Sequence, residues 1–422
     1  MARLFQNGSI ARADSREAER GDVLVSEEGV IEAVGVDLKP SESVEEIDCA
    51  GCVLVPGMFD LHVHAREPGF EHKETIETCA EAAMSGGVTG VVLMPDTMPP
   101  VDSGHVLKSI EDLVSERSPI VMKQAGCLTK KRAGETLAGY SGMAARGVPM
   151  LTDSNAAVPC PDLLRRCMEY AKDFDLLVTS YCDTPSLSKA GAINEGRVSY
   201  RLGIPGIPSI SQEIATDRDL RVAQLTGVRL HLQQVSTAHA LRAIALAKEE
   251  GVSVTCEVST HHLLLCEDDI PDYNTHYKLD PPLRLSSDRE ALLAGLIEGT
   301  IDIIASNHAP HTEFEKAADF GSAPFGVAGL ETAVLAIYDR LIRPGEIGWD
   351  LLVKSYSKRP REIIGIDPIR IEKGERAEFF VFDPSGETAI TPEALKTKSP
   401  VTPFLGTTFA GAIRETVVGG KG

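Results

Sequence analysis

Two histidines separated by one residue, His62 and His64, give the sequence its clearest chemical signal. They lie in the string DLHVHAREPG (residues 60–69), at the end of an apolar run. Because alternate residues of a β-strand point to the same side, both imidazoles would project together from a strand end. Two imidazoles so placed are a ready pair of zinc ligands. A lone histidine is usually structural, but this string predicts a present or former metal site.

Further polar residues stand where other apolar runs end. They are Asp96, Asp153, Tyr181, Gln234, His262 and Asn307. Taken singly, each is better explained as a helix cap or a turn residue. Barrel enzymes, however, build their active sites at the carboxyl ends of their strands, so the shared placement predicts one common site.

The unit that must position these residues is an amphipathic helix followed by an apolar strand, and it recurs along the middle of the chain. Residues 74–86 place Ile76, Cys79 and Ala83 on one helical face before the apolar run 88–94. Three more pairs have helical faces at 164–171, 241–245 and 292–297, with strands at 176–180, 252–258 and 301–306. Apolar strands alternating with helices indicate a parallel sheet covered on both faces. We therefore predict an α/β fold with a (β/α)8 TIM-type barrel over residues 56–365.

Both ends of the chain have a different pattern. Residues 1–55 and 366–422 contain short alternating strands separated by turns, such as DVLVSE (22–27) and KGERAEFFVFD (373–383). We expect these two ends to pair into one small composite β-domain beside the barrel.

Composition limits the partners. The 422 residues are 43% hydrophobic and carry a net charge of −20, which disfavours nucleic acid and anionic membranes. The nine cysteines are odd in number and scattered, so Cys49 and Cys52 are best explained as a chance pair in a reduced protein. Neither a signal peptide nor a membrane span is evident, and we expect a cytoplasmic protein. The sequence leaves homo-oligomerisation open.

The whole chain from about residue 4 resembles the zinc-dependent, long-chain bacterial dihydroorotases of the amidohydrolase superfamily. The matching strings are DLHVHAREPG, GGVTGVVLMPDTMPP, INEGRVSYRLGIPGIP, HLQQVST, EVSTHHLLLCEDDI, DPPLR, DREALLAGL, NHAPHTEFEK and SPVTPFLG. The resemblance implies reversible ring closure of N-carbamoyl-aspartate to dihydroorotate in pyrimidine biosynthesis.

The metal ligands implied by this resemblance are only partly present. His62, His64 and Asp153 match the two histidines and the bridging aspartate of the first metal. Tyr181 and Gln234 stand where the second metal would have histidines, and neither is a good zinc ligand beside imidazole. We therefore expect at most one zinc per chain, or none.

The resemblance also places substitutions at the catalytic and substrate-binding positions. Asn307 stands where the family has its aspartate base, and an amide cannot accept the proton of the nucleophilic water. Arg66 and His311 match residues that hold the substrate carboxylate. Asp96 and Asp280 replace two asparagines of that set, and their charges would repel an anionic substrate.

Two functions follow as expectations. The favoured one is a dihydroorotase-like protein with little or no dihydroorotase activity that acts as a structural partner, because inactive homologues in other bacteria scaffold aspartate carbamoyltransferase. The alternative is an active zinc-dependent cyclic amide hydrolase, mononuclear or with an altered substrate. A binding module that keeps the pocket without chemistry has the least support.

Overall fold

A closed barrel forms the larger part of the fold. In this computed structural model, which describes residues 1–39 and 44–419, seven parallel strands surround the barrel axis: β8 (Met58–Val63), β9 (Val88–Leu93), β10 (Val121–Gln124), β11 (Val178–Tyr181), β14 (Leu230–Gln233), β15 (Val254–Ser259) and β16 (Ile303–Ala305). Leu151 forms single parallel bridges to Gly126 and Val178, and so fills the eighth place between β10 and β11. Val63 pairs with His308 in the same way and closes the ring. The predicted (β/α)8 barrel is confirmed.

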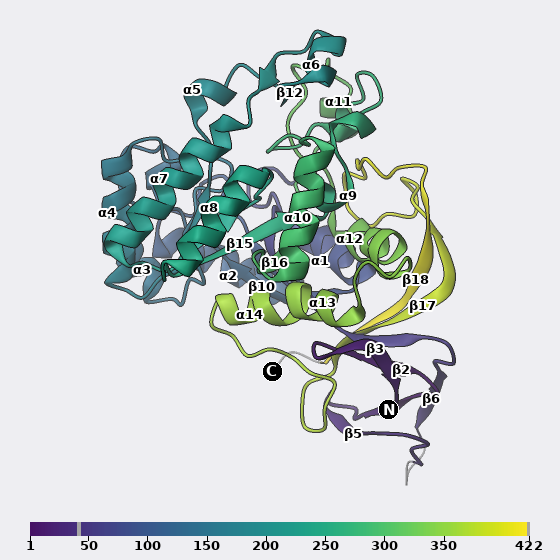
Figure 1. Ribbon diagram of the computed structural model, residues 1–422. Helices are drawn as coiled ribbons and strands as arrows, with labels where there is room; N and C mark the ends of the chain where they lie inside the picture. The colour runs from purple at the N-terminus through teal and green to yellow at the C-terminus, as the bar shows by residue number, and fades with distance from the viewer. Residues whose placement is uncertain (40–43, 420–422) are drawn as a thin grey trace.

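Helices cover the outside of this barrel (Figure 1). The longer ones are α1 (Ile76–Ser85), α2 (Gly104–Arg117), α4 (Pro161–Lys172), α7 (Ile210–Thr226), α8 (Ala238–Glu249), α10 (Ser286–Glu298) and α12 (Leu330–Ile337). Short helices lie in the connections: α3 (Tyr140–Ala144), α5 (Pro185–Ser188), α6 (Arg197–Leu202), α9 (Thr260–Leu264), α11 (Glu313–Lys316), α13 (Trp349–Val353) and α14 (Arg359–Ile363). The four helix–strand units that the sequence predicts are all present, close to their expected bounds.

Local sequence explains where such a unit begins and ends. Thr75 Oγ1 accepts a hydrogen bond from Thr78 N and so caps the start of α1. The helix stops at Gly86, and Gly87 follows with a φ of 74°, a conformation that glycine adopts without strain. The chain then enters β9 directly, so the helix packs back onto its own strand.

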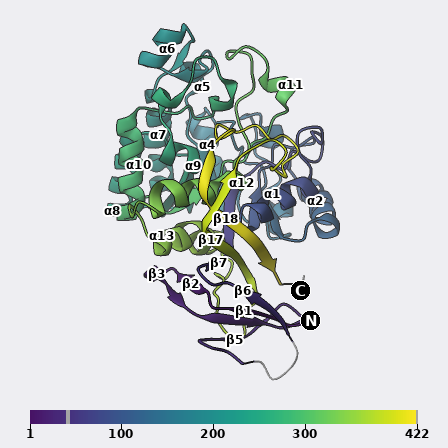
Figure 2. The same ribbon diagram turned by 90° about the vertical axis from the view of Figure 1, so that its right-hand side faces the viewer.

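The two chain ends form a β-domain beneath the barrel (Figures 1 and 2). Its elements are β1 (Arg3–Gln6), β2 (Ser9–Arg12), β3 (Ser15–Arg20), β4 (Asp22–Val25), β5 (Ile31–Gly35), β6 (Glu45–Asp48), β7 (Val53–Pro56), β17 (Glu378–Ala389) and β18 (Thr408–Val418). They make a sheet of order β5-β4-β1-β6 and a second of order β18-β17-β7-β2-β3. Strand β17 pairs antiparallel with β7, which joins the carboxyl-terminal end of the chain to the amino-terminal end as predicted.

Strand β17 lies between two hydrophobic cores. Phe379 and Val381 belong to the core of the β-domain, whereas Phe380 and Phe382 belong to the large core that the barrel helices share. This alternation follows from the two-residue period of a strand. The β-domain and the barrel are therefore packed onto the two faces of one strand.

Across the described residues, no helix combines the length and the apolar character needed to cross a membrane.

Candidate active site

The predicted site residues gather at one end of the barrel, where its strands end. His62 belongs to β8 and Tyr181 is the last residue of β11, while Gln234 and Asn307 follow β14 and β16 closely. Arg66, Gln234 and Asn307 have left-handed backbone, with φ of 63°, 51° and 51°. Such strained conformations cost about 1–3 kcal/mol each and cluster at functional sites. These three of the ten non-glycine residues with positive φ in the described part of the chain lie on the rim that the sequence indicates.

His62 is held from both sides. Its Nδ1 lies 2.6 Å from Glu257 Oε1, and because that partner is a carboxylate, Nδ1 carries the proton. The lone pair is then left on Nε2, which faces Gln234 Nε2 at 3.0 Å. The same amide nitrogen donates to Asn307 Oδ1 at 2.6 Å. His62, Gln234 and Asn307 therefore form one buried cluster joined by the amide of Gln234.

Glu257 is a site residue that sequence reasoning missed. It is fully buried in β15, and its Oε2 lies 3.2 Å from His231 Nε2 while Oε1 contacts His62. Burial raises its pKa, but the two imidazoles outweigh burial and lower the pKa to about 2. One signal points to it: an acid inside the apolar run VSVTCEV (252–258) can be buried only if it has partners.

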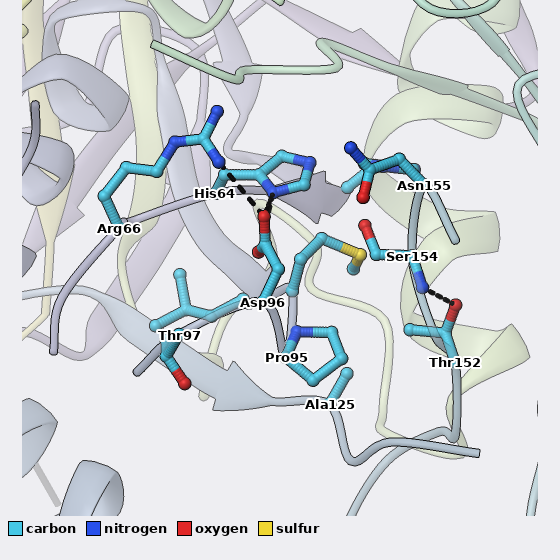
Figure 3. Close-up of polar contacts among 12 residues, drawn as sticks. His64, Arg66, Pro95, Asp96, Thr97, Ala125, Thr152, Ser154 and Asn155 are labelled. Carbon is cyan, nitrogen blue, oxygen red and sulfur yellow. Dashed lines mark hydrogen bonds and ion pairs between the residues drawn. The ribbon is translucent and has the colours of Figure 1, made fainter. Parts of the chain in front are cut away.

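Asp96 joins His64 to Arg66. Figure 3 shows its carboxylate between the imidazole and the guanidinium, 2.8 Å from His64 Nδ1 and 3.0 Å from Arg66 Nη1. Burial raises the pKa of Asp96, but the contacts with His64 and the charge of Arg66 outweigh burial and hold the pKa well below its usual range. The carboxylate is therefore ionised and already neutralises the arginine.

Arg66 and His311 come together as the resemblance leads one to expect. Arg66 Nη2 lies 3.1 Å from His311 Nε2, and Lys73 Nζ lies 3.1 Å from His311 Nδ1. Burial and the two cations lower the pKa of His311 to about 2, so the imidazole is neutral. A neutral imidazole has one acceptor nitrogen, so only one of the two cations donates a hydrogen bond to it.

Tyr181 and Asp280 contact each other rather than the histidines. The hydroxyl of Tyr181 donates to Asp280 Oδ1. Burial raises the pKa of Asp280 to about 6, although this hydrogen bond opposes the shift. His262 is another rim candidate. Its Nε2 lies 3.1 Å from Pro281 O and donates to this carbonyl, and its Nδ1 lies 2.7 Å from the hydroxyl of Ser259 and accepts from it. It therefore supports the segment that carries Asp280.

Asp153 is engaged elsewhere. Its Oδ1 accepts from Thr129 N at 3.0 Å, and its Oδ2 accepts from Thr129 Oγ1. Burial raises the pKa of Asp153 to about 6 against these hydrogen bonds. Over residues 1–39 and 44–419, no three His, Cys, Asp or Glu side chains are grouped so that they could hold a metal ion. The expected zinc set of His62, His64 and Asp153 is thus not assembled in the described part of the chain.

Comparisons with known proteins identify the family. A family model described as dihydro-orotase-like matches residues 51–240. The dihydroorotase of Carboxydothermus hydrogenoformans is 39% identical over 97% of this chain and 95% of its own length. That of Brevibacillus brevis is 40% identical over 100% of this chain and 99% of its own. The chain belongs to the dihydroorotase family. The predicted family is confirmed, and with it the link to pyrimidine biosynthesis.

Solved structures show the same fold. An L-hydantoinase (dihydropyrimidinase) from Arthrobacter aurescens has a TM-score of 0.86 at 21% identity, covering 99% of this chain and 95% of its own. A dihydropyrimidinase from Brevibacillus agri has a TM-score of 0.84 at 23% identity, covering 100% and 94%. At these identities the likeness bears on architecture, and it agrees with the barrel and β-domain described above.

The residues of this dihydroorotase-family protein do not fit the zinc pair that the resemblance implies. The lone pair of His62 Nε2 is directed at the amide nitrogen of Gln234, whose hydrogens repel a cation. Both oxygens of Asp153 accept hydrogen bonds from Thr129. Tyr181 is turned to Asp280. His62 thus has a hydrogen-bond donor where a metal would bind, and Asp153 and Tyr181 are directed to other protein groups.

Proposed function

We propose that this dihydroorotase-family protein hydrolyses dihydroorotate poorly or not at all, and that it serves pyrimidine biosynthesis as a structural partner. The observation that carries the proposal is the hydrogen bonding of the Asn307 side chain. Its Oδ1 accepts from Gln234, and an amide oxygen cannot take the proton of an attacking water. Loss of a general base alone lowers a rate by about 10²–10⁴-fold.

The substrate side supports the same proposal. Dihydroorotate carries a carboxylate, and the arginine that the resemblance assigns to it, Arg66, is already paired with Asp96 at 3.0 Å. An incoming carboxylate would meet the ionised Asp96 beside its intended partner, at a cost of about 4 kcal/mol for two like charges 4 Å apart near a protein surface.

His308 is not free to replace the missing base. His308 follows Asn307 directly, but its Nδ1 accepts from Gly329 N at 3.2 Å and its Nε2 lies 3.3 Å from Glu74 Oε2. It is fully buried. His308 is therefore committed to other partners.

The test is dihydroorotate hydrolysis by the unmodified protein, followed by ultraviolet absorbance with and without added zinc. We expect turnover far below that of an active dihydroorotase measured in parallel, and no growth without uracil of a host that lacks its own dihydroorotase. Asn307→Asp alone should recover little. Restoring Tyr181→His, Gln234→His, Asn307→Asp, Asp96→Asn and Asp280→Asn together should recover measurably more, because these groups act as one unit. Robust turnover by the unmodified chain would overturn the proposal.

A working cyclic amide hydrolase is the second candidate. The relatives favour it, because full-length proteins at 39% and 40% identity carry the name dihydroorotase. The same assay decides between the two, extended to neutral cyclic amides such as dihydrouracil and hydantoin. Turnover of a neutral ring together with inert dihydroorotate would favour an altered substrate.

The structural role has its own test. Inactive homologues in other bacteria scaffold aspartate carbamoyltransferase, and on that ground we propose this enzyme as the partner. Co-expression of the two chains followed by size-exclusion chromatography should give one complex, and separate elution at micromolar concentration would exclude that partner.

A further inference from the structure

We infer that the side-chain amide of Gln234 takes the structural place of a metal ion between His62 and Asn307, so that this barrel centre is assembled without metal. The amide nitrogen lies 3.0 Å from His62 Nε2 and 2.6 Å from Asn307 Oδ1. All three side chains are nearly inaccessible to solvent, at 1%, 3% and 4% exposure for His62, Gln234 and Asn307.

The chemistry of an amide matches what a metal would do here. A metal ion draws two ligands together because each gives it a lone pair. The NH₂ group of Gln234 has two N–H donors, and it satisfies the lone pair of an imidazole with one and that of a carbonyl with the other. Glu257 fixes the tautomer that makes this work, because its carboxylate holds the proton of His62 on Nδ1.

The same geometry excludes a zinc ion. Zinc binds an imidazole nitrogen at about 2.0–2.1 Å. A zinc ion on the His62 lone pair, in line with the amide, would therefore lie roughly 1 Å from Gln234 Nε2, which is a steric overlap. The main-chain carbonyl of Gln234 accepts from Gln212 Nε2 at 3.0 Å, which holds the backbone of this residue in its left-handed conformation.

Two variants test whether the amide donors of Gln234 hold the cluster together and whether a histidine in their place would bind zinc. Gln234→Met keeps the length and apolar volume of the side chain but removes both donors, leaving the lone pairs of His62 and Asn307 buried without partners. Gln234→His replaces donors by a metal ligand beside His62. Gln224→His, at an exposed position on α7, adds one imidazole away from the cluster and serves as the matched control.

The readouts are zinc content by elemental analysis after dialysis, and the melting temperature with zinc or with a chelator. We expect the unmodified protein to retain no zinc and to melt at the same temperature in both conditions. Gln234→Met should melt several degrees lower and still retain no zinc, as its thioether is a poor zinc ligand. Gln234→His should retain up to one zinc per chain and melt higher with zinc, and adding His62→Ala should abolish both gains. The Gln224→His control should behave like the unmodified protein.

Either of two results would overturn the inference: stoichiometric zinc in the unmodified protein with a lower melting temperature in chelator, or Gln234→His with no more zinc than the control. The first needs no variant, so it decides the matter even if Gln234→Met fails to fold. Neither readout is turnover. Hydrolysis by metal-free protein would overturn the proposed function and leave this inference standing. Tightly bound zinc in an inactive protein would overturn this inference and leave the proposed function standing.

Discussion

Four of the five residues at which this chain departs from the dihydroorotase pattern contact one another in pairs. Gln234 donates to Asn307, and Tyr181 donates to Asp280. Each of these contacts joins two positions where the resemblance leads one to expect a different residue. A change on one side is therefore matched on the other, although Gln234 Oε1 is left buried without a hydrogen-bond partner. Energetically such pairs are not independent, so reverting one member alone breaks a buried contact before it restores a function.

Asp96→Asn is the first prediction at this scale. The change removes the charge that neutralises Arg66 and keeps the shape of the side chain. We expect dihydroorotate to bind at least about tenfold more tightly, since a tenfold change needs only about 1.4 kcal/mol and removal of a close like charge is worth more. Isothermal titration calorimetry at neutral pH measures it.

Two controls accompany that titration. Asp173→Asn removes one charge from an exposed position outside the site and should leave the affinity unchanged. Dihydrouracil lacks the carboxylate, so its affinity should not respond to Asp96→Asn. Equal gains for both ligands would show that the effect does not pass through the charge of Arg66.

The raised pKa of Asp280 predicts how the stability of the folded protein depends on pH. Burial raises its pKa in the folded protein to about 6, above the value of about 3.9 in an unfolded chain. A raised folded pKa means that the folded state binds the proton more tightly. The stabilisation from this group is therefore fully present below about pH 4 and is lost as the pH rises through about 6, a loss of about 3 kcal/mol.

Asp280→Asn should remove this dependence, since an amide does not titrate and still accepts from Tyr181. We expect the variant to be more stable than the unmodified protein at pH 7.5 and little different at pH 4.5, as measured by urea unfolding. Asp153, whose pKa is also raised to about 6, keeps its own share of the pH dependence in both proteins. An Asp280→Asn protein that is less stable to urea than the parent at pH 7.5 would contradict the predicted direction of the change in stability.

At the scale of elements, the sequence predicts the barrel well because its signals are local. The face of Ile76, Cys79 and Ala83 and the stop at Gly86 define α1, and an apolar run then defines β9. The weakest strand is the one before Asp153: the run VPMLT (148–152) forms only isolated bridges at Leu151. A segment that short cannot be recognised as part of a sheet without its neighbours.

The candidate site was predictable in position but not in its contacts. The ends of strands fix where His62, Tyr181 and Gln234 lie, because parallel strands bring their carboxyl ends to one rim. Which side chain each one meets depends on rotamers and on residues far away in the sequence. Asp153 shows the difference, because Thr129, 24 positions earlier, takes both of its oxygens. Nothing in the sequence around Asp153 indicates that partner.

At the scale of the whole molecule, strand β17 makes the barrel and the β-domain depend on each other. On one of its faces Phe379 packs edge to face against Phe5, with ring centroids 5.0 Å apart. On the other, Phe382 packs against Tyr338 at 4.5 Å and against Trp349 at 5.4 Å. Unfolding either part exposes the partner face of the same strand, so the two should unfold as one cooperative unit.

Phe379→Ala and Phe382→Ala test that coupling from opposite faces. Each removes a fully buried aromatic side chain, at a cost of about 3–5 kcal/mol. Trp349 is the chain's only tryptophan, so its fluorescence reports the barrel side of β17, while far-ultraviolet circular dichroism reports the helices. We expect each variant to lower the temperature of a single unfolding transition that both signals report, although Phe379 itself packs in the core of the β-domain. Phe314→Ala, at a side chain that is 90% exposed, should leave the transition in place. A Phe379→Ala protein whose helical signal melts at the parent temperature would show instead that the β-domain unfolds separately.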